Sequence, residues 1–528
     1  MYRKIKTDNY QNISQMYHVS ELLGKIVDSF GYSNDEISSF FHPIEKFVLD
    51  EKVFQPLKET LYRIKQDKKK VFIFGDYDCD GICATTIAVM MLKKLSIDYG
   101  FYIPDRIKEG YGLNSDRLQQ SYQKGYQVLF TVDNGVSQNQ QLRWAKEHQM
   151  TVIVCDHHKI SQKLDCDCFL HPDLLDSPYH NLSAAATLYL LCKYLGVDDD
   201  KIKILAMLSI LSDVMSLKGI NIKIVKEGLA LLNQKKYLNL LFLDKFELPL
   251  NEDDVSFKIV PKINSIGRLA DYGNANRVVD FLLEENEKNI VSYCNQINYV
   301  NSLRISMSQK QYQLVLKQVD TADNFNFVFI NDLHEGLLGL IANKLLSYSG
   351  KTSFVLTKSD NVVKCSARSN DDSLMAILLQ YKDNFIHFGG HDKACGFTIN
   401  EESIEPLKQF LNDKLTDCIN EIIYPYIELQ ENDLTLKNCQ EVFSYRPFGQ
   451  DRKLPLVKVS FSNIKDYRKL KTDNQLKWTL DSSIEIISFD NKGYDYYLDK
   501  DYLTVIGQLK ENRFRNKISY QIICNTIF

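Results

Sequence analysis

The feature that most constrains this chain is an apolar run that ends in three alternating carboxylates. Residues 71–75 read Val-Phe-Ile-Phe-Gly, and Asp76, Asp78 and Asp80 follow before the small apolar run 82–90. This order predicts a strand, a tight acidic loop and a helix. Carboxylates this close repel one another, and a bound cation would neutralise them. An acidic turn with an N-cap cluster stays open as the alternative, because aspartate is favoured in both places.

Two further apolar runs end in the same way. The run 127–132 ends at Asp133, and the run 151–155 ends at Asp156-His157-His158. Helix-forming stretches separate the runs, so the pattern predicts an α/β domain with a doubly wound parallel sheet. Ligands bind outside the carboxyl ends of parallel strands, so we expect a site along this edge. One strand end could carry an aspartate by chance, but the joint occurrence favours a site.

The rest of the chain predicts several parts. Few helix breakers interrupt residues 284–319, which indicates a long connecting helix, and strands and helices alternate again after it. Beyond residue 422, short alternating strands with polar turns predict a small OB-like β-barrel. The expected parts are an N-terminal segment that packs on the sheet that follows it, the first α/β domain, the connecting helix, a second α/β domain and the OB-like domain, at 1–65, 66–283, 284–320, 321–421 and 422–528.

Composition sets broad limits. The 528 residues are 44% hydrophobic and 25% charged, which is typical of a chain with a sizeable core. A net charge of -4 does not decide whether the partner is a polyanion, because the position of the basic groups matters. The 12 cysteines lack paired CxxC spacing, and the first residues lack an apolar signal core. We therefore expect reduced thiols in a soluble cytoplasmic protein.

Several motifs resemble those of the DHH phosphoesterase superfamily. In chain order these are Asp-Tyr-Asp-Cys-Asp-Gly, Val-Asp-Asn-Gly, Asp-His-His and Ser-Asp-Val, at 76–81, 132–135, 156–158 and 212–214. Within the superfamily the chain most resembles the RecJ exonuclease family, through the segments 104–106, 110–112, 261–269, 366–369, 389–391 and 446–449. The segments 366–369 and 389–391 resemble a DHH-associated domain, and 446–449 resembles the start of an OB-fold. The resemblance covers nearly everything after residue 65.

The resemblance implies two divalent cations, Mn²⁺ or Mg²⁺, which together can activate water and neutralise a phosphodiester. Manganese is the better expectation, because an imidazole nitrogen is a softer ligand than oxygen. Phe74 stands where the family commonly has histidine, so Asp76 is a candidate replacement ligand, whereas Cys79 replaces a small residue. Asp133 would bridge the two ions, and the full implied ligand set is Asp76, Asp78, Asp80, Asp133, His157 and Asp213.

The resemblance also implies roles for residues that contact the substrate. His158 would contact the reacting phosphate, and Asp156 would orient a neighbouring histidine. The glycines and histidine of 389–391 would contact the scissile or an adjacent phosphate, and a terminal phosphate and the DNA would contact Arg106, Tyr111, Asn264, Arg268, Ser366 and Arg368. Arginine pairs bidentately with phosphate, whereas Lys262 stands where the family usually has arginine. Ion pairs for the arginines, a packing role for Tyr111, and a glycine turn at Gly389, Gly390 and His391 remain alternatives.

The β-rich tail carries basic residues interleaved with aromatic ones. The basic residues are Arg446, Arg452, Lys453, Lys458, Lys465, Arg468, Lys469, Lys471 and Lys477, and the aromatic residues are Phe448, Phe461, Tyr467 and Trp478. This mixture suits sequence-tolerant binding of a single strand on an OB-fold. A solvated, lysine-rich surface is the alternative.

Together these observations predict a metal-dependent 5′→3′ exonuclease that degrades single-stranded DNA in repair and recombination. A helicase and a single-strand-binding protein are expected partners, since duplexes must be opened first. One alternative is a DHH-superfamily phosphodiesterase for oligonucleotides or cyclic dinucleotides, although such relatives generally lack the connecting helix and the OB-like domain. Family-II pyrophosphatases share the metal motifs but are shorter still. A non-catalytic single-strand-binding factor of replication or repair is the alternative from another class.

Overall fold

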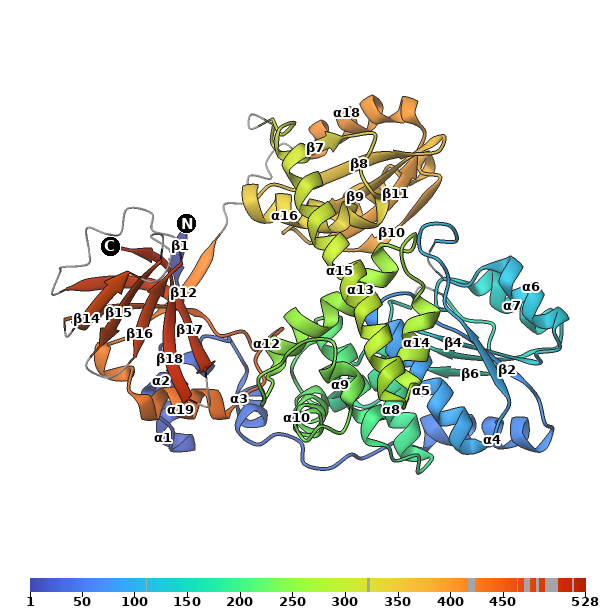
Figure 1. Cartoon of the computed structure of the whole chain (residues 1–528), viewed down its shortest axis with the longest axis horizontal. Helices are drawn as coiled ribbons and strands as arrows, with labels where there is room; N and C mark the ends of the chain where they lie inside the picture. Colours follow the sequence, from blue (N-terminus) through green and yellow to red (C-terminus); the bar gives the residue numbers. More distant parts are fainter. Residues whose placement is uncertain are drawn as a thin grey trace.

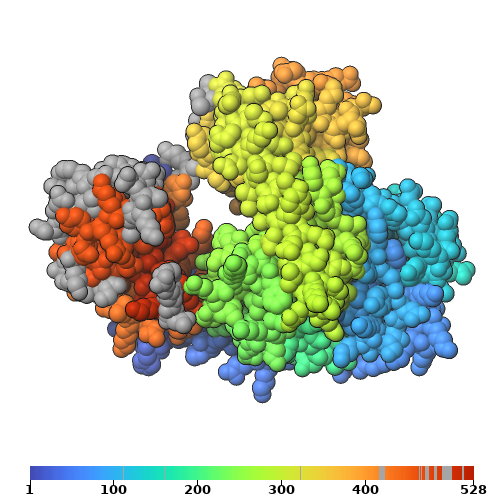
Figure 2. Space-filling model, in the orientation of Figure 1, coloured from blue at the N-terminus to red at the C-terminus, as the bar shows by residue number. Residues whose placement is uncertain are grey.

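A computed structural model describes residues 1–110, 112–160, 162–320, 323–415, 423–462, 464–469, 475–480, 484–489, 502–514 and 517–528. Figure 1 shows three bodies, with a first α/β domain joined to a second one by a long helix and a β-rich body to one side. The β-rich body touches the first domain and is set apart from the second in the face that Figure 2 presents. Among these residues, no helix combines the length and apolar character needed to cross a bilayer.

The first domain is built on a five-stranded parallel sheet. Its strands, in the order β3-β2-β4-β5-β6, all run in the same direction. Their bounds are β2 Val71–Phe74, β3 Tyr99–Tyr102, β4 Val128–Val132, β5 Thr151–Cys155 and β6 Cys168–Leu170. The predicted doubly wound sheet is confirmed, and the order reverses between β2 and β4, which is where such sheets bind ligands.

Helices cover both faces of this sheet. Helix α5 (Cys79–Leu95) is apolar nearly all round and lies in one large core together with α4, α8 and α9. A smaller core on the other face contains apolar residues of α6 and α7. The remaining bounds in this domain are α4 Glu51–Gln66, α6 Ser115–Gln123, α7 Asn139–Glu147, α8 Ala184–Tyr194, α9 Asp200–Ser212, α10 Ile220–Asn233, α11 Leu238–Leu241 and α14 Ala275–Leu283.

One helical run crosses the top of the first domain and leads toward the second. It comprises α12 (Glu252–Asp254), a π-helix (Val255–Ile259) and α13 (Val260–Arg268). The connecting helix α15 (Glu287–Leu316) is 30 residues long, as its lack of breakers predicted. It packs on α13 and on α16 of the second domain, and so holds the two α/β domains together.

The second domain contains a mixed sheet in the order β10-β11-β9-β8-β7. Strands β7 and β8 are parallel, and the other neighbours are antiparallel. The bounds are β7 Asn326–Phe329, β8 Ser353–Ser359, β9 Val362–Arg368, β10 His387–His391, β11 Ala394–Ile399, α16 Leu338–Ser349, α17 Leu374–Leu379 and α18 Ile404–Lys414. Short 3-10 helices occur in all three bodies. Those of the first domain are Pro172–Leu174 and Ser177–Tyr179, those of the second are Glu335–Leu337, Lys382–Asn384 and Glu401–Ser403, and that of the C-terminal body is Glu431–Asp433.

The C-terminal body is an eight-stranded sheet in the order β1-β12-β13-β17-β18-β16-β15-β14. The bounds are β12 Tyr424–Glu428, α19 Leu436–Ser444, β13 Leu456–Phe461, β14 Ile464–Lys469, β15 Leu476–Leu480, β16 Glu485–Ser488, β17 Leu503–Phe514 and β18 Lys517–Ile527. The β-rich composition was predicted, but the participation of the N-terminal strand β1 (Tyr2–Lys4) was not.

Most of the N-terminal segment packs elsewhere than predicted. Strand β1 pairs in parallel with β12, and the buried faces of α1 (Tyr10–Tyr17), α2 (Glu21–Asp28) and α3 (Asn34–Phe41) join the core of the C-terminal body. Only α4 lies against the first sheet. The expectation that residues 1–65 pack on the sheet that follows is therefore wrong for the first three helices. Their periodicity shows an apolar face but not which core covers it.

Candidate metal centre and phosphate site

Aspartates from three strand ends meet at one edge of the first sheet. Asp76 follows β2, Asp133 follows β4 and Asp156 follows β5, and all three are buried. Asp78 is the N-cap of α5 and accepts a hydrogen bond from the Gly81 N–H at 3.1 Å. Asp80 lies in the first turn of the same helix. The parallel sheet therefore gathers these carboxylates as the spacing predicted.

The predicted ligand residues form overlapping groups. One group is Asp76, Asp78 and Asp133, and another is Asp80, His157 and Asp213; within each, one ligand atom per residue lies within 4.8 Å of the others. His157 Nε2 lies 3.2 Å from Asp133 Oδ1, 3.4 Å from Asp213 Oδ2 and 3.7 Å from Asp80 Oδ2. Asp133 therefore stands between the two groups, and all six residues converge on one place.

The charges of this cluster suit divalent cations. Burial, followed by the charge of Asp78, raises the pKa of Asp80 to about 7. Burial also raises the pKa values of Asp76, Asp133 and Asp213, and neighbouring carboxylates add to each rise. Burial and then the charge of His158 lower the pKa of His157 to about 3, so its imidazole is neutral, as a ligand must be.

The donor atoms fit Mn²⁺ or Mg²⁺. Asp76 Oδ1 is buried and has no hydrogen-bond partner in the described part of the chain. A set of carboxylate oxygens with one or two imidazole nitrogens is hard enough for magnesium and also suits manganese. The residues present therefore fit a pair of such ions.

Backbone and amide groups hold the acidic loop in place. The two oxygens of Asp80 accept hydrogen bonds from the N–H groups of Ala184 (2.8 Å) and Ala185 (2.9 Å), at the start of α8. The Asn264 side-chain oxygen accepts from the Cys79 N–H at 2.8 Å, whereas the sequence assigned Asn264 to DNA. Asn134, which was not predicted, donates to the carbonyl oxygens that end β2 and β4. The α8 amides also escaped sequence analysis, because backbone groups leave no residue signature.

Asp156 holds His158 beside the cluster. Its Oδ1 accepts hydrogen bonds from the N–H groups of His157 (2.7 Å) and His158 (3.1 Å), and lies 2.8 Å from His158 Nδ1. Burial acts to raise the pKa of Asp156, but the hydrogen bonds and charge of His158, together with the Val136 N–H, outweigh burial and lower it. Burial acts to lower the pKa of His158, but the hydrogen bond and charge of Asp156, together with the charges of Asp76 and Asp78, outweigh that effect and raise it. The raised pKa favours the protonated, positively charged form of His158, whose ring lies beside the carboxylate cluster.

The second domain contributes His391 to the same place. Its ring lies 5.8 Å from the His158 ring, centroid to centroid, with 17° between the planes. Burial, followed by the charge of His158, lowers the pKa of His391. Gly390, in strand β10, has φ of 145°, and a Cβ there would lie 2.3 Å from the Ala394 carbonyl oxygen, so this position requires glycine. At Gly389 a Cβ would meet open space.

The predicted arginines gather beside the cluster. Arg368 Nη1 donates to Ser366 Oγ at 3.0 Å. Burial, followed by the charges of Arg106, Arg304 and Arg368, lowers the pKa of Arg268 to about 9. Among the described residues, no ion pair joins any of these four arginines to a carboxylate, so the alternative of an ion pair for each is not observed. This concentration of positive charge suits an anion.

Arg304, from the connecting helix α15, was not predicted. It lies near enough to Arg268 to influence that residue's pKa, and its Nη2 donates to Asn301 at 2.7 Å. A lone arginine in a long helix carries no signal in the sequence. Gly339, in the first turn of α16, faces the cluster from the second domain, since a Cβ there would lie 2.7 Å from Arg368 Nη2.

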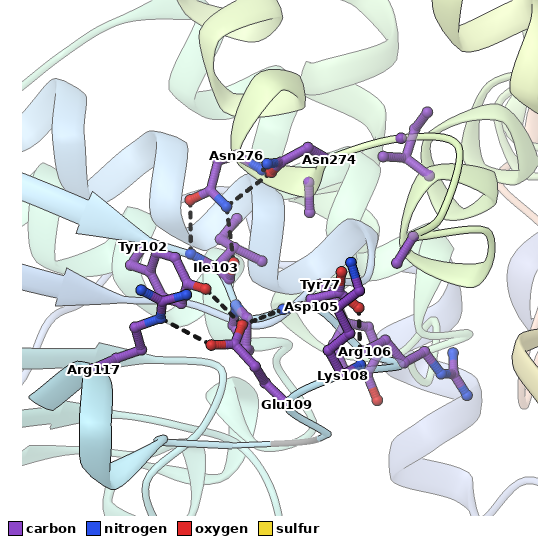
Figure 3. Close-up of a pocket in the computed structure, with 16 residues that line it drawn as sticks. Tyr77, Tyr102, Ile103, Asp105, Arg106, Lys108, Glu109, Arg117, Asn274 and Asn276 are labelled. Atoms are coloured by element: carbon purple, nitrogen blue, oxygen red, sulfur yellow. Dashed lines mark hydrogen bonds and ion pairs between the residues drawn. The ribbon is translucent and has the colours of Figure 1, made fainter. Parts of the chain in front are cut away.

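A cavity of about 410 Å³ opens beside Arg106 and Tyr77 (Figure 3). The Arg106 guanidinium lies 5.0 Å from the centre of the Tyr77 ring. On the opposite wall, Glu109 accepts from the Tyr102 hydroxyl at 2.5 Å and from Arg117 Nε at 2.9 Å. The polar groups on that wall are thus engaged with one another.

Three sequence departures have separate outcomes. Phe74 is buried in the core beside α6 and α7, with its ring 5.9 Å from the Tyr102 ring, and so does not face the acids. Lys262 Nζ donates to the Leu243 carbonyl at 2.7 Å and to Asp244 at 2.8 Å. Cys79 is fully buried within α5. Tyr111, which the resemblance assigned to contact with the DNA, lies outside the described residues.

The prediction for the basic, aromatic tail is wrong in part. Phe448, Phe461 and Trp478 are buried in the C-terminal core, and only Tyr467 among the four aromatic residues is exposed. Arg452 is 1% exposed, with its guanidinium 3.9 Å from the centre of the Phe40 ring. Arg446 pairs with Glu252 of the first domain, and Lys477 pairs with Glu485. Lys471 and the side chain of Lys465 lie outside what the structure describes. One face of each strand must pack into the core, and the local sequence does not show which face that is.

Three family models match separate blocks of the chain. They are the DHH family, N-terminal domain, at residues 70–214, the DHHA1 domain at 322–417 and the RecJ OB domain at 427–526. The chain is 27% identical over 547 aligned residues to the single-stranded-DNA-specific exonuclease RecJ of Bacillus subtilis, an alignment that covers 98% of this chain and 69% of that protein.

The chain belongs to the RecJ family.

Other RecJ proteins agree with this assignment. The Thermus thermophilus RecJ is 26% identical over 463 residues, covering 86% of this RecJ-family chain and 68% of that protein. The crystal structure of that RecJ with Mn²⁺ matches with a TM-score of 0.84 and 21% identity over 99% of this chain and 78% of the other, which shows the fold. A manganese-bound exonuclease RecJ matches with a TM-score of 0.61 and 25% identity, over 71% of this chain and 97% of that one.

Proposed function

We propose that this RecJ-family protein is a metal-dependent 5′→3′ exonuclease that hydrolyses the phosphodiester bonds of single-stranded DNA in repair and recombination. The observation that carries the proposal is the adjacency of two elements. Overlapping carboxylate and histidine groups, joined at Asp133, lie beside a cluster of arginines without carboxylate partners among the described residues. The first suits phosphodiester hydrolysis and the second suits recognition of a charged end.

Two divalent cations, Mn²⁺ or Mg²⁺, are the proposed cofactors. Asp76, Asp78 and Asp133 would hold one ion, and Asp80, His157, Asp213 and Asp133 the other. When bound, such ions supply hydroxide near neutral pH and offset the charge of the phosphate. The Ala184 and Ala185 amides keep the Asp80 carboxylate directed at its ion.

His158 and His391 are proposed to contact the scissile phosphate. Asp156 fixes the orientation of the His158 ring through the contact at Nδ1, which leaves Nε2 for a phosphate oxygen. His391, whose ring is nearly parallel to that of His158, is carried there by the end of strand β10, which includes Gly389 and Gly390. The substrate would therefore be held between the two α/β domains.

Recognition of the 5′ end is proposed to set the direction of cleavage. Arg106, Arg268, Ser366 and Arg368 would bind the terminal phosphate, because guanidinium groups pair with phosphate oxygens in a fork. The same arginines come from both domains, so the end of the strand would be bound only where the two meet. The adjacent cavity offers room for the terminal nucleoside. Its polar wall is engaged internally, which fits a substrate of varied base sequence.

Single-stranded DNA is the proposed substrate partly because the curated relatives from Bacillus subtilis and Thermus thermophilus are named single-stranded-DNA-specific exonucleases. A helicase and a single-strand-binding protein are proposed partners, since a single-strand nuclease needs opened duplex. A cytoplasmic location is also part of this proposal, because the proposed substrate is DNA.

The test uses a 5′-phosphorylated single strand labelled at either end, with Mn²⁺ and an Asp133→Ala variant as control. Release of 5′ mononucleotides, with progressive shortening of the 3′-labelled strand and none by the variant, is the expected result. Cleavage restricted to dinucleotides would replace the proposal with an oligonucleotide or cyclic-dinucleotide phosphodiesterase. Binding without cleavage by the unmodified protein would indicate a non-catalytic single-strand-binding factor.

A further inference from the structure

Two stretches of the first domain connect the metal centre to the C-terminal body. In the first, Glu252 accepts from Arg446 Nε (3.0 Å) and from the Phe448 N–H (2.8 Å) of the C-terminal body. The same helical run reaches the metal loop, where Asn264 accepts from the Cys79 N–H. Figure 1 shows α12 on the side toward the C-terminal body and α13 below the second domain. The run thus extends from one region to the other.

The second stretch is shorter. Asp213 belongs to the ligand cluster, and four residues later the Leu217 N–H donates to the Gln450 carbonyl at 3.0 Å. A single-stranded DNA that runs from the metal centre toward the C-terminal body would pass along both stretches.

Each stretch exposes one large apolar side chain part-way along. Phe257 is 74% exposed, while Val255 and Ile259 on either side are fully buried. Val214 is 63% exposed, directly follows Asp213 and has φ of 53°, which is strained for a β-branched residue. A single exposed apolar residue is ordinary on a protein surface. Two of them, on the two segments that join the metal centre to the C-terminal body, call for a shared explanation.

The direction of Phe257 follows from helical spacing. It precedes Asn264 by seven residues and Arg268 by eleven, spacings that return to the same face of an α-helix. The π-helix has a wider turn, which rotates the direction of the Phe257 side chain about the helix axis. This rotation is smaller than the angle between two consecutive residues of the helix. Phe257 therefore faces the side of the run that carries the metal loop contact and the arginine cluster.

The distances suit a neighbouring nucleotide. At 1.5 Å per residue, Phe257 lies about 10 Å along the axis from Asn264. That length corresponds to no more than about three nucleotides at the 3.4 Å spacing of a stacked strand. Arg268, at the other end of the run, marks the proposed site of the 5′ phosphate. Along the run, the terminal phosphate, the scissile phosphate and Phe257 therefore follow one another.

We propose that Phe257 stacks on a base of the single strand within about three nucleotides of the scissile phosphate on its 3′ side, with Val214 in apolar contact at the start of this path. The inference rests on the proposed function and adds a base-contact site to it. An aromatic face suits this position because every base offers a π surface, so the contact accepts any sequence. The exposed side chain has a partner only when the strand is present.

The test compares Phe257→Ala, Phe257→Trp and Phe257→Leu with Tyr62→Ala. Tyr62 is also an exposed aromatic, 47% accessible, but lies on α4 in a distant part of the first domain. For 5′-phosphorylated oligonucleotides, we expect Phe257→Ala to raise KM by about five- to 100-fold with a smaller change in kcat. Tryptophan should restore KM and leucine should not, and Tyr62→Ala should match the unmodified protein. Equal KM values in all four variants would overturn the inference.

A scan with abasic sites locates the contact. Single abasic residues are placed at successive positions from the 5′ end, and binding is measured by fluorescence anisotropy in the non-cleaving Asp133→Ala background. We expect one position near the scissile phosphate to weaken binding, and the same position to have no effect once Phe257 is alanine. Independent, additive losses would reject stacking by Phe257. Because this readout is binding, it separates failure of the inference from failure of the proposed cleavage, which the unmodified protein tests with Mn²⁺.

Discussion

At the scale of single residues, the site consists of two groups of like charges. The carboxylates of the metal centre repel one another, and so do the arginines of the cluster beside it. Asp76, Asp80, Asp133 and Asp213 all have raised pKa values, while burial and neighbouring arginines lower the pKa of Arg268. The acids could be predicted from the sequence because each follows a strand, opens a helix or ends one. Arg304 could not, because nothing near it in the chain indicates that its helix passes the arginine cluster.

Arg368 provides a prediction about the strand end. Replacing it with alanine should reduce the preference for a 5′ phosphate over a 5′ hydroxyl by about 10- to 100-fold, because charge-assisted hydrogen bonds are lost. Arg368→Lys keeps the charge but loses the forked guanidinium. Its preference for a 5′ phosphate should therefore lie between those of the unmodified protein and Arg368→Ala. The measurement is kcat/KM for matched oligonucleotides with and without the phosphate. An unchanged preference, with Mn²⁺ binding intact, would remove Arg368 from the end-binding site.

The raised pKa of Asp80 predicts how the metal-free protein responds to pH. Burial, followed by the charge of Asp78, moves this pKa from 3.8 to about 7. Between these values the folded state binds more protons than the unfolded chain, so its free energy of unfolding falls as the pH rises. The loss is complete above pH about 7, where the carboxylate is ionised.

A bound cation favours the ionised carboxylates and offsets this loss. Mn²⁺ should therefore raise Tm more at pH 8 than at pH 5, as thermal unfolding with and without the ion would show. Asp80→Asn should lose most of the increment at pH 8, whereas Asp383→Asn, an exposed aspartate of the second domain, should keep it. Equal increments at both pH values would argue against an ion held by these groups.

At the scale of helices and strands, one N-terminal contact illustrates what sequence periodicity leaves undecided. Helix α2 buries Lys25 against Asp433 of the C-terminal body, with 2.7 Å between Nζ and Oδ2 and side chains 8% and 9% exposed. The apolar spacing of α2 predicts a helix with a buried face. The ion pair spans most of the chain and is invisible to any local pattern.

Breaking that buried pair should destabilise the protein. Lys25→Met leaves Asp433 without its cation and should lower the free energy of unfolding by about 3 kcal/mol, because a buried charge loses its partner. Adding Asp433→Asn should recover part of the loss. Lys4 and Glu428, which join the same two parts of the chain at the surface, provide the control, and Lys4→Met should have a much smaller effect. Similar losses for both lysine variants in thermal unfolding would contradict this account.

At the scale of the whole molecule, the N-terminal helices and the C-terminal strands form one body, although the two α/β domains separate them in sequence. Their common core contains Leu22, Leu23 and Phe40 together with Val457 and Trp478. The first residues of the chain therefore belong to the β-rich body, and the link to α4 leads back to the first domain (Figure 1). Contacts between this body and the first domain include the ion pairs Arg446–Glu252 and Lys218–Glu36.

This arrangement predicts the outcome of truncation. A protein limited to residues 46–421 should retain cleavage of short oligonucleotides but lose affinity for long strands and processivity. Removing residues 423–528 alone should expose the apolar faces of the N-terminal helices and cause aggregation. Light scattering and nuclease assays on both truncations measure this. If the 46–421 protein folds but cleaves nothing, the C-terminal body would be needed for catalysis itself.

The sequence by itself determined the local elements and the chemistry of the site. Apolar runs of strand length that end in Asp133 or Asp156, separated by helical stretches, are enough to predict a parallel sheet with acids at one edge, because strand direction places those ends together. The tertiary structure alone decided which face of each C-terminal strand is buried, where the N-terminal helices dock and that Arg304 approaches Arg268. These outcomes depend on contacts between residues far apart in the chain, and the hydrophobic effect that drives such contacts has no direction, so an apolar face does not specify its partner.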